Sequence, residues 1–269
     1  MFFQKEPDIM PRVISKSDID FIIQDHIGNI IFEEALRKGR EPEDLLIDLG
    51  HYIRFNSIFG GGVANLAGEI GLRQELFIDH SEAVRIVADR SMDVAAKIFF
   101  AAVDEFGRYK THRAMAQNTF LESGKYFGLT GEELNQLVQI NQATNDAVGE
   151  VAKGYGINMK LNTSDLFTAI GFHMGSEILA DEEFNILDKY LREQHPDLVA
   201  HLEKNGAYHW VNVHTTVEAD HFESAVQGAN LALRYCDTTD HDWVCNQIVT
   251  GFANFANAQT GFMRSLLAD

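Results

Sequence analysis

The segment from Trp210 to His221 carries a pattern of side chains that is typical of metal ligands. At about 100° of rotation per residue, positions i, i+4 and i+7 of a helix return to nearly the same face, so His214, Glu218 and His221 form one polar stripe. The other positions of this helix are largely apolar or small. Two imidazoles and a carboxylate in this arrangement suit iron, manganese or zinc. The rise from His214 to His221 is about 10.5 Å, which suits a pair of metal ions better than one.

Two other interpretations of this segment have to be weighed. One is an exposed helix face with incidental histidines, although the third aligned residue and the apolar surroundings argue against it. The other is a ferritin-like di-iron bundle, because Glu218 and His221 also form a Glu-x-x-His motif. Such bundles use two of these motifs, and the sequence contains no second one. Further ligands must therefore come from other helices in a different arrangement.

On this motif the sequence resembles the heme-oxygenase-like di-metal oxidase family, which includes the chlamydial death-domain-associated protein. The last metal helix of that family carries His-x-x-x-Asp-x-x-His, and this chain has His214-Thr-Thr-Val-Glu218-Ala-Asp-His221. Glu218 thus replaces the family's Asp. The additional methylene group should preserve coordination but shift a metal ion or alter its bridging.

The resemblance implies three more ligands upstream. Glu105 and His112 fit the family's first Glu and His, and Glu177, which lies 37 residues before His214 among small and apolar residues, fits its lone Glu. In an unbroken helix Glu105 and His112 would lie about 10.5 Å apart along the axis, too far for one coordination sphere. Either Gly107 breaks the helix, or the two residues serve different metal ions.

The resemblance also implies a fold and an activity. The fold would be the heme-oxygenase-like bundle that TenA-like and PqqC-like proteins share. The six residues would hold two ferrous ions, with manganese as the alternative, in an enzyme that uses dioxygen as a co-substrate. This oxidase or oxygenase would act on a small metabolite, either amino-acid-derived or fatty-acid-like. No catalytic residue beyond the metal ligands is expected.

Three alternatives to this function stay open. One subgroup of the family is thought to consume its own tyrosine to make para-aminobenzoate. Ser176 and Trp210 stand where that subgroup has tyrosines beside the metal site, which favours an external substrate, although Tyr109 and Tyr208 keep the self-sacrificing alternative open. The second alternative is a non-catalytic protein that binds metal ions or a protein partner, and the third is a structural helical protein without metal.

Three further features are weaker candidates. His173 precedes Glu177 by one turn and is interpreted as a core histidine rather than a supporting residue or an extra ligand. His26 is interpreted as an ordinary helix histidine rather than a haem ligand. The Gly60–Gly62 cluster lacks the Lys-Ser/Thr of a phosphate loop, so it predicts a kink or a close helix contact.

The elements that must position these residues are predicted to be helices. No proline interrupts the chain from Glu43 to His195, and the apolar spacing is helical rather than alternating. Capping residues and glycines predict about eight helices. One begins at residue 42 and bends at 60–62. The others span 18–39, 81–106, 111–126, 130–154, 162–194, 211–234 and 243–267. The fold class is therefore all-α. No repeat or linker divides the chain, so residues 1–269 are expected to form a single helical domain.

Composition limits the partners. A net charge of −18 repels phosphate backbones and anionic lipid surfaces, so nucleic acid is not expected as a partner. No stretch is long and apolar enough for a membrane span, and the first residues lack the apolar core of a signal peptide. Cys236 and Cys245 fit neither a disulfide framework nor a zinc motif, so we expect a cytoplasmic protein. A homodimer is expected by analogy with the fold family alone.

Overall fold

A computed structural model describes residues 12–38, 41–107, 110–238 and 240–268, apart from the side chains of Val217, Glu218 and Ala268. Thirteen helices form within these ranges: α1 (Lys16–Asp25), α2 (Gly28–Lys38), α3 (Pro42–Asn56), α4 (Phe59–Gly71), α5 (Arg85–Ala88), α6 (Ser91–Phe106), α7 (His112–Tyr126), α8 (Gly131–Leu137), α9 (Gln142–Gly154), α10 (Thr163–Gln194), α11 (Pro196–Lys204), α12 (His209–Tyr235) and α13 (His241–Ala268). The β pairing within these ranges consists of two isolated bridges. The predicted all-α class is confirmed.

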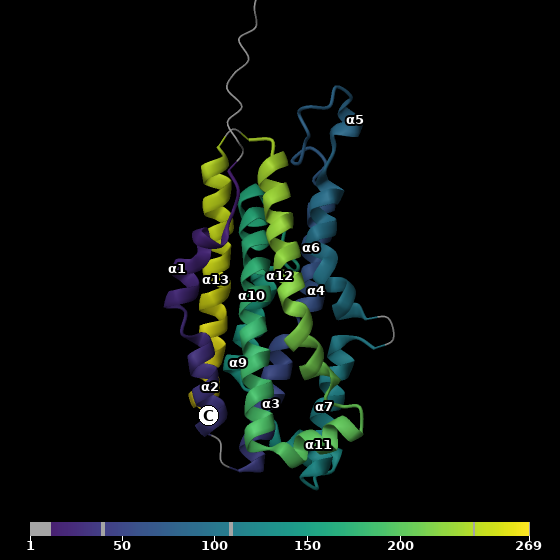
Figure 1. Ribbon diagram of the computed structural model, residues 1–269, viewed down its shortest axis with the longest axis vertical. Helices are drawn as coiled ribbons and strands as arrows, with labels where there is room; N and C mark the ends of the chain where they lie inside the picture. Colours follow the sequence, from purple (N-terminus) through teal and green to yellow (C-terminus); the bar gives the residue numbers. More distant parts are fainter. Residues whose placement is uncertain (1–11, 39–40, 108–109, 239, 269) are drawn as a thin grey trace, which may run out of the picture.

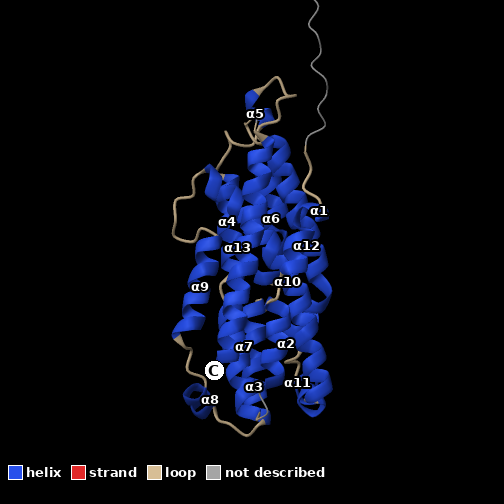
Figure 2. Ribbon diagram, turned by 90° about the vertical axis from the view of Figure 1, so that its left-hand side faces the viewer, coloured by secondary structure: helices blue, strands red, loops and turns tan. Residues whose placement is uncertain are grey.

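The three longest helices form the centre of the bundle. α10, α12 and α13 run side by side along the long axis of the molecule (Figure 1). α10 packs most extensively against α13 and α12, while α6 packs against both α4 and α12. Nearly every residue of α10 between Leu166 and Leu179 is buried, which is typical of a helix that is enclosed by others on all sides. Figure 2 shows α9 and α8 outside this core and α5 at one end of the molecule.

Two glycines allow α10 and α13 to approach closely. A Cβ atom at Gly171 would lie 1.7 Å from the carbonyl oxygen of Ile248, and one at Gly251 would lie 1.8 Å from that of Thr168. Both distances are far below van der Waals contact, so only glycine fits at either position. The two helices therefore touch through their backbones in the segment just before Glu177.

The N-terminal and middle helices are shorter than predicted. The predicted helix at 18–39 is two helices, α1 and α2, and the one at 130–154 is α8 and α9. The predicted helix start at 130 is confirmed, because Thr130 caps α8 through its hydroxyl, which accepts from the backbone amide of Glu133. Asn141 then caps α9 in the same way, by accepting from the amide of Thr144. A second capping residue inside an apolar run therefore marks a new helix rather than a continuation.

The prediction of one helix from Ser81 to Phe106 was wrong. Only α5 and α6 are helical there, and the segment before them is held as a loop by Phe77, which bridges to Cys236, and by Ile78, which bridges to Asp89. Phe77 and Ile78 are both buried. These contacts join segments far apart in the sequence, so local periodicity could not reveal them. The short helix α11, which begins at Pro196, was also not predicted.

The glycine cluster forms a close contact and not a bend. The chain turns at Ser57 and Ile58, and Gly60–Gly62 then lie in the first turn of α4. A Cβ at Gly62 would lie 2.5 Å from the ring of Tyr155, and one at Gly60 would lie 3.0 Å from Cβ of Glu105. Of the two structures expected from this cluster, the close helix contact is therefore confirmed. No helix in the described part of the chain combines the length and the apolar character that crossing a membrane requires.

Candidate metal centre

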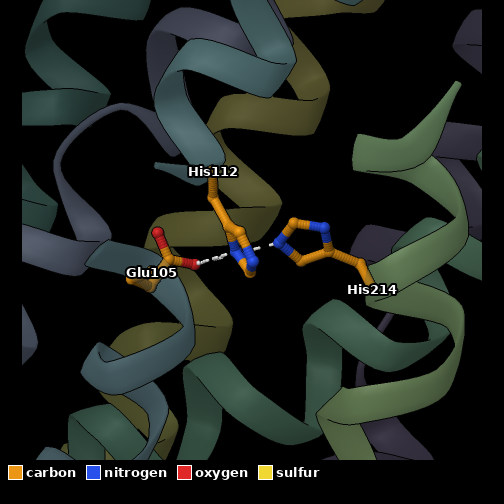
Figure 3. A group of neighbouring side chains, drawn as sticks. All are labelled: Glu105, His112 and His214. Atoms are coloured by element: carbon orange, nitrogen blue, oxygen red, sulfur yellow. Dashed lines mark hydrogen bonds and ion pairs between the residues drawn. The ribbon is translucent and has the colours of Figure 1, made fainter. Parts of the chain in front are cut away.

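Three of the predicted ligands meet at one point between three helices. Glu105 lies near the end of α6, His112 is the first residue of α7, and His214 lies in the second turn of α12. Their side chains point toward one another (Figure 3), and one ligand atom from each lies within 4.8 Å of the other two. Oε1 of Glu105 lies 3.0 Å from Nδ1 of His112 and 3.8 Å from Nε2 of His214. A single metal ion fits between atoms at such separations.

Gly107 brings Glu105 and His112 together. It ends α6 with φ 60° and ψ 161°, a conformation that is essentially restricted to glycine. A Cβ at this position would lie 2.0 Å from the carbonyl oxygen of Lys110. The predicted helix break at Gly107 is thus confirmed, and it removes the axial separation that a continuous helix would impose.

His214 is held in one orientation by its surroundings. Its Nδ1–H donates to the backbone carbonyl of Trp210 at 2.6 Å, which assigns the proton to Nδ1 and directs Nε2 toward Glu105. The ring of Phe184 stacks on the imidazole with ring centroids 4.0 Å apart. A histidine that donates from one ring nitrogen to a carbonyl while the other faces a carboxylate is the usual arrangement of a metal ligand.

The pKa values of these residues favour the ionisation states that a metal ion needs. Burial by itself raises the pKa of Glu105, but hydrogen bonds to His112 and His214 outweigh it and lower the pKa to about 2. Burial lowers the pKa of His214, an effect that Glu105 opposes only in part. Glu105 is therefore a carboxylate and His214 a neutral imidazole near neutral pH, which are the forms that coordinate metal ions.

Glu177 and His221 lie in a second group of side chains. Oε2 of Glu177 lies 3.4 Å from Nδ1 of His221, and its Oε1 lies 3.1 Å from Nδ1 of His173. Nε2 of His221 lies 3.0 Å from Oδ2 of Asp104. All of these residues except Asp104 are buried. Burial raises the pKa of Glu177, but the two histidines beside it outweigh this effect and hold the pKa well below its usual range.

Two members of this second group, Asp104 and His173, were not predicted from the sequence as parts of the site. Asp104 directly precedes Glu105, but neighbouring residues on a helix point about 100° apart, so the two carboxylates reach different histidines. His173 was interpreted as a core histidine, and it does lie in the core, but it also contacts Glu177 and lies 3.4 Å from the hydroxyl of Tyr155. Its spacing of one helical turn before Glu177 was the signal.

Glu218 cannot be placed in either group. Its backbone lies within α12, between His214 and His221, but its side chain lies outside the described residues. Its assignment as a ligand therefore stays a prediction.

A cavity of about 370 Å³ adjoins both groups. Glu105, His112 and His214 line it on one side, and Glu177 lines it together with Ser176. Aromatic rings form much of the remaining wall, including Phe59, Phe184, Trp210 and Phe255. A space of this size is at the lower end of the range that holds small-molecule ligands.

Comparison with known proteins identifies the fold. No protein-family model matches the sequence, and no curated protein matches it. Among solved structures, a domain of unknown function with a heme oxygenase-like fold from Shewanella denitrificans matches with a TM-score of 0.56 and 13% identity, over 94% of this chain and 88% of that one. This chain has a heme-oxygenase-like fold.

Two further solved structures match this chain with higher TM-scores. A CADD-like protein of unknown function from Nostoc punctiforme matches with a TM-score of 0.64 and 12% identity, over 94% of this chain and 95% of that one. A TenA homolog from Pseudomonas syringae pv. tomato matches with a TM-score of 0.61 and 8% identity, over 94% and 91%. At these identities the likeness establishes the heme-oxygenase-like fold and leaves the chemistry to the residues of this chain.

Proposed function

We propose that this chain is a non-haem, dinuclear metal enzyme that uses dioxygen to oxidise a small metabolite, with iron as the metal and manganese as the alternative. The observation that carries the proposal is the convergence of Glu105, His112 and His214 from three helices, with ligand atoms within 4.8 Å of one another. Carboxylate and imidazole together suit iron and manganese. The heme-oxygenase-like fold and the cavity beside the cluster support it further.

The chain offers ligands for two ions. Glu105, His112 and His214 would hold the first ion. Glu177 and His221 would hold the second, with Glu218 as the third ligand that the spacing on α12 predicts. A bound ferrous pair would supply the electrons for reducing dioxygen, chemistry that amino-acid side chains alone do not provide.

The side chains around the ligands hold them in place. The carbonyl of Trp210 fixes the ring of His214, and Phe184 stacks on the same ring. The hydroxyl of Tyr155 lies 2.7 Å from Oγ of Ser176, one residue before Glu177. The aromatic walls of the cavity would hold the apolar part of a substrate beside the ligands.

An external substrate fits these surroundings better than a tyrosine of the protein itself. Tyr208 is buried, and its hydroxyl donates to Asp188 at 2.9 Å. The residues that line the cavity within the described part of the chain do not include it. Tyr109, the other tyrosine considered from the sequence, lies outside the described residues.

Metal binding tests the first half of the proposal. After anaerobic reconstitution with ferrous iron, crystals should show two anomalous peaks at the iron edge, one between Glu105, His112 and His214 and one beside Glu177 and His221. His214→Ala should lower iron affinity at least about tenfold, since it removes a direct ligand. His209→Ala is the matched control, because His209 lies on the same helix but is exposed. A single peak with four ligands in tetrahedral geometry, or no peak between these helices, would refute the proposed site.

Oxygen consumption tests the second half. The iron-loaded protein should consume dioxygen faster in the presence of a suitable small metabolite, and His214→Ala should abolish this increase. Iron binding without any oxygen consumption across a panel of amine and carboxylate metabolites would favour a non-catalytic metal-binding protein. No iron binding at all, with full stability of His214→Ala, would favour a structural helical protein.

A further inference from the structure

Glu183 is a buried carboxyl group in the same cavity with no role in the proposed metal site. It lies on α10 nearly two turns beyond Glu177, is only 2% exposed, and lines the cavity together with Glu105 and Glu177. Charged residues are rarely buried unless they are paired. The position of Glu183 therefore calls for a physical reason.

Two hydrogen-bond donors are directed at Glu183. The hydroxyl of Tyr52 donates to Oε2 at 2.8 Å, and Nε2 of Gln259 donates to Oε1. The same amide nitrogen donates to Oδ1 of Asn29 at 2.8 Å, which fixes the orientation of Gln259. Both carboxyl oxygens thus act as acceptors. This pattern suits a carboxylate better than a carboxylic acid that must donate a proton of its own.

The protein supplies no opposite charge to Glu183 among the described residues. The neighbours that act on its pKa are Gln259, Tyr52 and Glu182, and none of them is basic. Burial raises the pKa of Glu183 to about 7, with a smaller contribution from the negative charge of Glu182. A carboxylate that is buried without a cation is strongly disfavoured, so a cation that enters the cavity would be bound favourably.

The rest of the cavity also favours a cation with an apolar body. Three carboxyl groups from the described residues line it, those of Glu105, Glu177 and Glu183, and two of these belong to the proposed metal site. Among the lining residues that the structure describes, the one lysine or arginine is Arg113, whose side chain is exposed and donates to the carbonyl of Ser57. Aromatic rings make up much of the wall between these charges.

We propose that Glu183 binds the ammonium group of an amine substrate, with the substrate's apolar part against the aromatic wall and beside the metal ligands. This inference rests on the proposed function, because it names the substrate class of that same cavity. Tyr52 and Gln259 hold the carboxylate in place, so the ammonium group forms a charge-assisted hydrogen bond with a preorganised acceptor. Of the two classes of metabolite considered from the sequence, this favours the amino-acid-derived class, whose members can carry an amine, over the fatty-acid-like class.

Matched probes of equal length test the inference. The affinities of hexylamine, hexanol and hexanoate are measured anaerobically by isothermal titration calorimetry on the iron-reconstituted protein. Hexylamine should bind at least about tenfold more tightly than the other two probes, as expected for a hydrogen bond between charged groups. Glu183→Gln should remove this preference. Glu193→Gln, which changes an exposed glutamate on the same helix, should retain it.

Each outcome supports or overturns the inference. Tightest binding of hexanoate, binding of none of the three probes, or an unchanged hexylamine affinity in Glu183→Gln would overturn it. The last outcome would indicate direct coordination of the amine by the metal ion. Circular dichroism and iron content are measured on every variant, and Glu183→Gln should match the wild type in both. The protein could also bind no iron and still prefer hexylamine in a way that depends on Glu183. That result would refute the proposed function and support the amine site.

Discussion

His214 and His221 lie on the same helix, but their imidazoles contact different carboxylates. His214 faces Glu105, while His221 lies between Glu177 and Asp104. Seven residues of helix place their Cα atoms about 10.5 Å apart along the axis. One helix thus contributes a histidine to each of two neighbouring groups, which is the arrangement that a dinuclear site needs.

The residues of this site differ in how far the sequence could predict them. His214 and His221 follow from helix geometry, since their spacing alone places them on one face. Glu105, His112 and Glu177 were predicted mainly from the resemblance. Asp104 and Glu183 were not predicted, because nothing in the sequence distinguishes them from the many glutamates and aspartates of an acidic chain that remain exposed.

The raised pKa of Glu183 predicts a specific pH dependence of stability. Its pKa is about 7 in the folded protein against 4.5 for the unperturbed group, so the folded state holds the proton more strongly. The contribution of this group to stability is fully present below about pH 4.5 and is lost as the pH rises through about 7. Glutamine cannot lose a proton. Glu183→Gln should therefore unfold with nearly the wild-type free energy at acidic pH, but with a higher one at pH 8, by up to about 3 kcal/mol.

Urea unfolding at about pH 4 and about pH 8 measures this difference. Glu193→Gln is the control, because an exposed glutamate should change the free energy of unfolding little at either pH. Parallel pH profiles of wild type and Glu183→Gln would show that Glu183 has an ordinary pKa in the folded protein.

The break between α6 and α7 determines whether Glu105 and His112 can share a metal ion. α6 and α7 would form one continuous helix by apolar periodicity alone, and Glu105 and His112 would then lie too far apart to share a metal ion. Gly107 allows the chain to turn between them. The glycine was visible in the sequence, but whether it bends a helix or ends it depends on the packing of α7 against α3, α11 and α12.

Gly107→Ala should distort the backbone turn that brings Glu105 and His112 together. A Cβ atom would clash with the carbonyl of Lys110, and alanine disfavours the positive φ at this position. We expect a loss of stability of about 1 to 3 kcal/mol and at least a tenfold lower iron affinity, measured by urea unfolding and by iron titration.

Gly128→Ala provides the matched control for this substitution. Gly128 also has a positive φ, but it lies just beyond the other end of α7, and nothing lies within 4 Å of a Cβ placed there. It should lower stability while leaving iron affinity unchanged. Equal iron affinities in the two variants would show that the turn at Gly107 does not position the ligands.

α10 and α13 join distant parts of the chain. α13, at the C-terminal end, contacts α1, α2 and α3 from the N-terminal region as well as α9 and α10. We propose on this basis that the chain forms a single domain, as the absence of linkers in the sequence predicts. The homodimer expected from the fold family stays a prediction, which sedimentation analysis of the 30.2 kDa chain can test.

The two tryptophans can report whether the chain unfolds as one unit. Trp210 packs beside His214, while Trp243 packs against Phe167 near the start of α10. Trp210→Phe and Trp243→Phe each leave one tryptophan to report on its surroundings. In each variant, the urea midpoint of the tryptophan fluorescence should equal the midpoint of the helical circular dichroism. Separate fluorescence and circular dichroism midpoints in either variant would indicate two independently folding parts.

Local sequence patterns were enough to predict the helical class, the cap of α8 at Thr130 and the shared helix face of His214 and His221. These depend on residues within a few turns of one another, so local spacing contains the information. Three other features became visible only in the folded chain: Phe77 holds a loop against Cys236, Asp104 reaches His221, and Glu183 is buried in the cavity between Tyr52 and Gln259. Each of these contacts joins segments that are distant in the sequence, and their approach depends on packing that no single segment encodes.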